Sequence, residues 1–109
     1  MATTYKVLGQ VNPSATTATT AYTVPSATET VISTIVVANL GPAPESYRIA
    51  VRPDGEALAN KHYIVYDATV AAVDTITLTI GLTLNATDVV TVYASSANFA
   101  FNIYGSEIA

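Results

Sequence analysis

The sequence predicts an all-β protein: a single-domain antiparallel β-sandwich of jelly-roll type with about eight strands. Three observations lead to this fold class. Apolar and polar side chains alternate with a period of two in most segments, as in strands that bury one face. Turn-forming residues such as Pro53-Asp54-Gly55 separate these segments at short intervals. The 109 residues make one domain, 1–109, and contain no cysteine, so packing and backbone hydrogen bonds alone must stabilise it.

The segment 74–84 alternates most regularly, with its isoleucines and leucines on one side and its threonines on the other. It predicts one long strand with one buried face. Further strands are predicted over 5–11, 18–24, 30–39, 46–52, 63–68, 88–94 and 99–104. In the first of them, Tyr5, Val7 and Val11 share a parity and are expected to face the core. A single helical turn is expected over 56–61.

The segment 30–39 is apolar on both faces, which indicates a central strand or one whose outer face a partner covers. Two regions are therefore candidates for contact with another chain. One is this strand, around Ile32, Val36 and Val37. The other is the N-terminus, where residues 1–4 could form a flexible arm that leads into Tyr5.

Charged residues make up only 11% of the chain, whereas about 25% is typical of soluble domains. So few charges indicate that some apolar surface is covered by other copies, in a homo-oligomer such as a dimer or trimer. Four scattered cations cannot neutralise many phosphates, so nucleic acid is not expected as a partner. No stretch approaches the roughly 18 apolar residues of a membrane helix, and no signal-peptide core is present, so no membrane partner is expected.

The single histidine, His62, has no nucleophile and orienting carboxylate near it in the sequence. We interpret it as a surface or loop-end residue, and we predict that the protein is not an enzyme. Asp54, Asp67, Asp74 and Asp88 stand at strand ends or turns without the spacing of a calcium loop. No metal and no cofactor are predicted.

Tyrosine dominates the aromatic residues, with seven Tyr, two Phe and no Trp. Tyr93 and Tyr104 fall on faces opposite the expected core residues, so they are candidates for contact with a carbohydrate or a protein. Alternatively, each tyrosine ring packs in the core and only its hydroxyl reaches the surface. The sequence pattern does not distinguish between these two interpretations.

Several strings give the chain a family resemblance: YKVLGQVNP at 5–13, YTVP at 22–25, RIAVRP at 48–53, KHYI at 61–64 and NIYGSEI at 102–108. Together they resemble small virion proteins of tailed bacteriophages. The resemblance implies a structural component of the phage particle, and most concretely a capsid decoration or cement protein. Such a protein binds the outer capsid surface and stabilises the head.

The resemblance also implies partners and a location. The partners would be other copies of the chain and the phage major capsid protein. The chain would be made in the bacterial host cytoplasm and would end in the virion, on the capsid surface. A tail, baseplate or fibre component and a glycan-binding surface module remain as alternatives. No site residues come with the resemblance.

Overall fold

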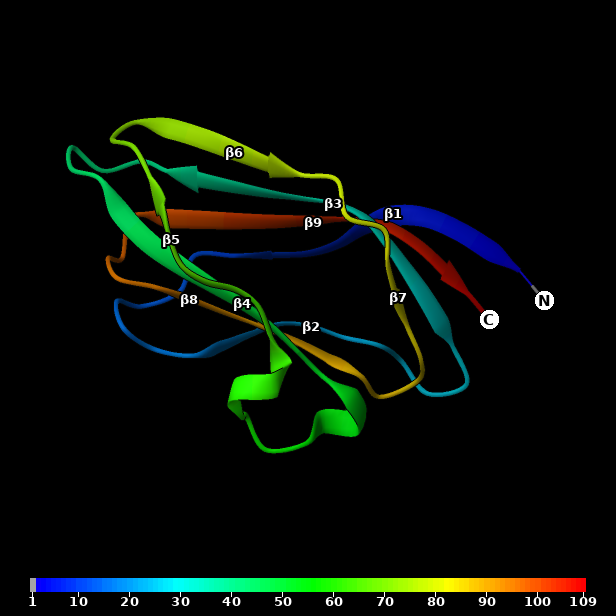
Figure 1. The fold of residues 1–109 in the computed structure, drawn as a ribbon. Coiled ribbons are helices and arrows are strands. Elements are labelled where there is room, and N and C mark those ends of the chain that lie inside the picture. Colours follow the sequence, from blue (N-terminus) through cyan, green and yellow to red (C-terminus); the bar gives the residue numbers. More distant parts are fainter. Residues whose placement is uncertain (1) are drawn as a thin grey trace.

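The computed structural model describes residues 2–109, which form a single β-sandwich with nine strands and two short 3-10 turns (Figure 1). The all-β prediction is thus confirmed. The strands are β1 (Thr3–Val11), β2 (Thr19–Thr23), β3 (Glu29–Asn39), β4 (Glu45–Arg52), β5 (Tyr63–Val70), β6 (Asp74–Leu78), β7 (Leu82–Leu84), β8 (Val89–Ala94) and β9 (Phe99–Ile108). The turns η1 (Pro53–Gly55) and η2 (Asn60–His62) replace the helical turn expected over 56–61.

The strands form two antiparallel sheets that stack on one another (Figure 1). Sheet A has the order β1-β9-β3-β6, and β7 also pairs with β3; sheet B has the order β2-β8-β4-β5. The pairing is nested, since β1 pairs with β9, β2 with β8, β3 with β6 and β7, and β4 with β5. An antiparallel ribbon folded over on itself in this way is a jelly roll.

The core lies between the two sheets and is built from the inward-facing side chains of alternating positions. Phe99 and Phe101 of β9 pack against Tyr47 of β4, with ring centroids 6.3 and 6.2 Å from that of Tyr47. One buried polar residue, Asn39, ties the sheets together at one end. Its side-chain amide donates to the carbonyls of Val70, the last residue of β5, and of Ala71 after it, as well as to the carbonyl of Ala43 in a loop.

The segment 74–84 does not form one strand, contrary to the prediction. It divides into β6 and β7, which pair with different parts of the long strand β3. Gly81 adopts a φ of +57° between them, a conformation that glycine tolerates well, and Ile80 is exposed there. The alternation itself holds on either side, since Ile76 and Leu78 pack against the core.

A β-bulge in β1 reverses part of the predicted burial. The pairing with β9 shifts register between Val7 and Gly9, so that Leu8 is an extra residue. An extra residue inverts the side-chain parity beyond it. Val11 therefore packs against the core as predicted, whereas Tyr5 and Val7 face outward, contrary to the prediction.

A second bulge has the same effect in β3, where the register with β9 shifts between Ile32 and Thr34. The sequence pattern places Ile32 on the same face as Val36. With the bulge at Ser33, Ile32 instead faces inward together with Ile35 and Val37, and all three are fully buried.

The N-terminal residues belong to sheet A. Thr3 pairs with Ile108, and the backbones of Ala2 and Ala109 exchange two hydrogen bonds of 2.8 and 2.9 Å. Both ends of the chain consequently lie side by side at one end of the molecule (Figure 1). Residues 2–4 therefore do not form the flexible arm considered for 1–4, and Met1 lies outside the described residues.

Candidate functional site

Most of the outer face of sheet A is uncharged. Register and alternation assign to it the side chains of Thr3, Tyr5, Val7, Gln10, Glu29, Val31, Thr34, Val36, Ala38, Thr75, Thr77, Thr83, Ala100, Asn102, Tyr104, Ser106 and Ile108. Of these, only Glu29, at the start of β3, is charged at neutral pH. A partner that covers this face away from Glu29 would desolvate few charges.

One end of this outer face is hollow and apolar. Tyr5, Val7, Val31 and Tyr104 line a depression of about 580 Å³, together with Lys6 and the small residues Ser33, Gly105 and Ser106. Tyr5 is 85% exposed and Val7 46% exposed, so two neighbouring apolar side chains of β1 lie open to solvent. Exposed apolar groups that gather in one concave place are typical of contact surfaces.

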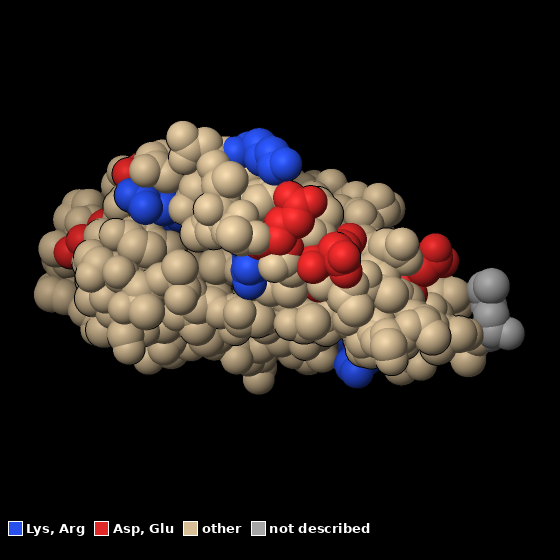
Figure 2. All heavy atoms as spheres, turned by 90° about the horizontal axis from the view of Figure 1, so that it is seen from below, with Lys and Arg blue, Asp and Glu red and all other residues tan. Residues whose placement is uncertain are grey.

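The charges closest to this hollow neutralise each other. Lys6 pairs with Glu107 at 3.1 Å, and the Tyr22 hydroxyl donates a hydrogen bond of 2.6 Å to the same carboxylate. The hydrogen bond from Tyr22, and then the one from Lys6, hold the pKa of Glu107 below its usual value. Figure 2 shows the molecule from below, where uncharged residues cover most of the surface and acidic and basic side chains gather near its middle.

The structure brings together some of the predicted contact residues and separates others. Tyr5, Tyr104 and Val36 all belong to the outer face of sheet A. Ile32 and Val37 have no exposed surface, so they are core residues and cannot form an interface of the folded chain. This corrects the prediction, and for Ile32 the cause is the bulge at Ser33.

Tyr93 lies on the other sheet, in a cluster that the sequence did not reveal. Its ring lies under the guanidinium of Arg48, with Cζ 4.2 Å from the ring centroid, and the ring of Tyr66 lies at the same distance from Cζ. Asp67 binds the same guanidinium, with Oδ1 2.6 Å from Nε and Oδ2 3.2 Å from Nη2. We call Arg48, Tyr63, Tyr66, Asp67 and Tyr93 the Arg48 cluster.

A bulge in β5 creates this arrangement. Tyr47 pairs with Ala68 and Ile49 with Val65, so Tyr66 and Asp67 lie opposite the single residue Arg48. Asp67 adopts a φ of +53°, which costs backbone strain in a non-glycine residue. Both bulge side chains thereby reach Arg48. The paired charges raise the pKa of Arg48 and lower that of Asp67, in each case mainly through their hydrogen bonds.

Tyr63 extends the cluster toward a second hollow. Its ring meets that of Tyr66 edge to face, with centroids 4.9 Å apart. Tyr63, Tyr66 and Asn60 line a depression of about 450 Å³. The sequence pattern does not indicate this site, because Tyr63 and Tyr66 have opposite parity in the predicted strand. The position of Arg48 opposite Tyr66 depends on the bulge.

His62 is a structural residue rather than a surface one. It ends η2, as a loop-end residue, but only 5% of it is exposed, which corrects the expected surface position. Nδ1 accepts a hydrogen bond of 3.0 Å from the backbone N–H of Ala59, so Nε2 carries the proton and faces Glu56 at 3.3 Å. The hydrogen bond with His62 is the main reason why the pKa of Glu56 is lowered.

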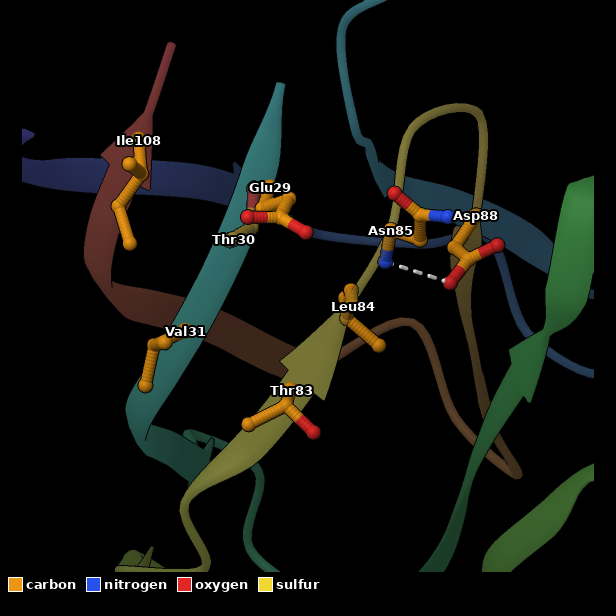
Figure 3. Close-up of a pocket in the computed structure, with 8 residues that line it drawn as sticks. All are labelled: Glu29, Thr30, Val31, Thr83, Leu84, Asn85, Asp88 and Ile108. Atoms are coloured by element: carbon orange, nitrogen blue, oxygen red, sulfur yellow. Dashed lines mark hydrogen bonds between the residues drawn. The ribbon is translucent and has the colours of Figure 1, made fainter. Parts of the chain in front are cut away.

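A third hollow, of about 470 Å³, lies between the start of β3 and β7 (Figure 3). Asp88 at its edge accepts hydrogen bonds from the backbone N–H groups of Asn85 and Asp54. The carboxylate thus stabilises the two loops. Across residues 2–109, no three His, Asp or Glu side chains are grouped so that they could hold a metal ion.

Within the same range, no helix has the length and apolar character needed to cross a membrane. Comparison of the chain with protein-family models, curated proteins and solved structures gave no match.

Proposed function

We propose that the protein is a bacteriophage virion structural protein, a capsid decoration protein that binds the outer surface of the head and stabilises it. The observation that carries the proposal is the outer face of sheet A, which is uncharged except at Glu29, with its apolar hollow. The sequence strings that resemble small virion proteins support it independently. The role is one of binding and requires no catalytic step.

The physical argument concerns what this face can bind. Apart from Glu29, its outward side chains are uncharged polar or apolar ones, which bury at a lower desolvation penalty than charged groups. The five strands provide a broad and stiff surface, and the exposed rings of Tyr5 and Tyr104 are the kind of side chains that anchor interfaces. Repeated over many copies on a shell, modest contacts add up.

The jelly roll suits this role because it is a rigid unit with two opposite faces. Fold alone does not determine function, so the assignment depends on the surface described above. Self-association into a dimer or trimer belongs to the same proposal, since symmetric contacts multiply the area that each copy buries. Sedimentation of the chain alone should give a mass two or three times that of the monomer.

The experiment uses heads assembled from the phage major capsid protein without this chain. We expect the purified chain to bind them saturably and in high copy number, and the decorated heads to burst at a higher temperature than bare ones. Binding only to tails, or no binding to heads, would contradict the proposal.

Two matched variants test whether the chain contacts the head through the outer face of sheet A. Val7→Asp introduces a charge into the apolar hollow, and we expect head binding to weaken by about tenfold or more. Val73→Asp introduces the same charge in the loop between β5 and β6, where Val73 is 77% exposed, and should bind like the parent chain. Equal binding by all three proteins would exclude this face as the contact.

A further inference from the structure

The geometry of the Arg48 cluster points to a binding site for an uncharged saccharide on the outer side of sheet B, in the hollow lined by Asn60, Tyr63 and Tyr66. This site is separate from the proposed head-binding face, and saccharide binding does not depend on that proposal. The inference stands on three features: the exposure of the rings, their fixed orientation and the neutral charge of the site.

The rings are available to a ligand. Tyr66 remains 58% exposed although it contacts both Arg48 and Tyr63. The hollow beside it measures about 450 Å³, within the size range of small-molecule sites. More than half of the Tyr66 side chain is therefore accessible to a ligand.

The site is also held in place before any ligand arrives. The Arg48 guanidinium lies 4.2 Å from the ring centroids of both Tyr66 and Tyr93, and Asp67 fixes it with two hydrogen bonds. The bulge that presents Tyr66 and Asp67 together needs a strained φ of +53° at Asp67. Strain of this kind is frequently retained where it orients a functional group.

The chemistry of the site selects the class of ligand. Arg48 and Asp67 cancel each other's charge, so the site favours neither anions nor cations. The faces of tyrosine rings carry partial negative charge and attract the weakly positive C–H groups of a pyranose ring. Around them, the Asp67 carboxylate, whose side chain is 44% exposed, can accept hydrogen bonds from hydroxyls, and the Asn60 amide can both donate and accept. A neutral hexopyranose unit presents both kinds of group.

The test is an NMR titration of the full chain with maltotetraose, cellotetraose and chitotetraose, following the tyrosine ring signals. We expect at least one of them to bind with a Kd of about 1 mM or tighter and to shift the Tyr66 signals. Tyr66→Ala should weaken that binding by about tenfold, and Tyr66→Phe should retain it, because stacking requires the ring and not the hydroxyl. Tyr5→Ala, the same change on an exposed residue of sheet A, is the matched control. It should bind the saccharide with the affinity of the parent chain.

Two results would overturn the inference: no binding of any of the three saccharides, or binding that Tyr66→Ala leaves unchanged. A chain that binds heads but none of these sugars would refute the saccharide site alone. A chain that binds a sugar through Tyr66 but no heads would refute only the proposed function.

Discussion

The hydroxyl of Tyr22 in β2 donates a hydrogen bond of 2.6 Å to Glu107 in β9, and this bond joins sheet B to sheet A. Thr30 of β3 adds a bond of 2.8 Å to the same hydroxyl. Burial, and then the hydrogen bond to Glu107, raise the pKa of Tyr22 to about 12. The pair thus couples the stability of the sandwich to pH in both directions.

On the acid side, Glu107 has a lower pKa in the folded chain than its unfolded value of about 4.3. Its contribution to the free energy of unfolding is therefore present above that value and is lost as the pH falls through the folded pKa. We expect Glu107→Gln to lower stability at pH 7 by roughly 1 kcal/mol and to reduce the acid dependence. Urea unfolding from pH 7 to pH 2 measures both quantities. The control Glu29→Gln, at an exposed position, should behave like the parent chain. A Glu107→Gln chain whose stability falls with pH as steeply as that of its parent would contradict the account.

On the alkaline side, stability is lost as the pH rises. Since the folded pKa of Tyr22 lies above the unfolded value of about 10, its contribution is present below pH 10 and is lost as the pH rises through about 12. We expect Tyr22→Phe to lose less stability than the parent chain as the pH rises from about 10 to about 12. Thermal unfolding between pH 9 and pH 12 tests this, and a Tyr22→Phe chain that loses stability as steeply as its parent would refute the raised pKa.

Asn39 should be among the most sensitive polar residues. It is 2% exposed, its amide donates to three backbone carbonyls, and its Oδ1 accepts from the N–H of Gly41 at 3.0 Å. Asn39→Asp keeps the shape but places a carboxylate against carbonyl oxygens, so we expect a loss of roughly 3 kcal/mol in urea unfolding. Asn60→Ala, at an exposed position, should change stability by less than about 0.5 kcal/mol. A mild effect of Asn39→Asp would show that other contacts hold this loop.

His62 provides a direct contrast between sequence and structure. As a surface residue it would tolerate alanine, but as the buried acceptor for the Ala59 N–H it should not. We expect His62→Ala to destabilise the chain by roughly 1–3 kcal/mol, and His62→Asn, whose Oδ1 can replace Nδ1, to lose clearly less. Equal stability of His62→Ala and the parent chain in urea unfolding would restore the sequence-based interpretation.

The sequence predicts the class of fold well because the period of two determines which segments are strands and, in most of them, which face is buried. Ile76 and Leu78 face the core with the threonines of β6 outside, as the alternation requires. Tyr47 and Ile49 of β4 are also buried, whereas Arg48 between them reaches the surface cluster.

Several of the errors share one physical cause, which is the β-bulge. An extra residue at Leu8 turns Tyr5 outward, one at Ser33 turns Ile32 inward, and the bulge at Asp67 creates the Arg48 cluster. A bulge depends on the partner strand and on the twist of the sheet, so the alternation within one segment does not reveal it. For this reason the alternation predicts Val36 and Tyr104 as contact residues, but it predicts neither the outward position of Val7 beside Tyr5 nor the Arg48 cluster.

The central claim is that the outer face of sheet A docks on the phage head, and a reconstruction of the native particle tests it most directly. We predict jelly-roll density at regular positions over the outside of the shell, with Tyr5, Val7 and Tyr104 against the major capsid protein and the Arg48 cluster pointing away. Copies that are confined to the tail, that are absent from the particle, or that contact the shell through sheet B would contradict the claim.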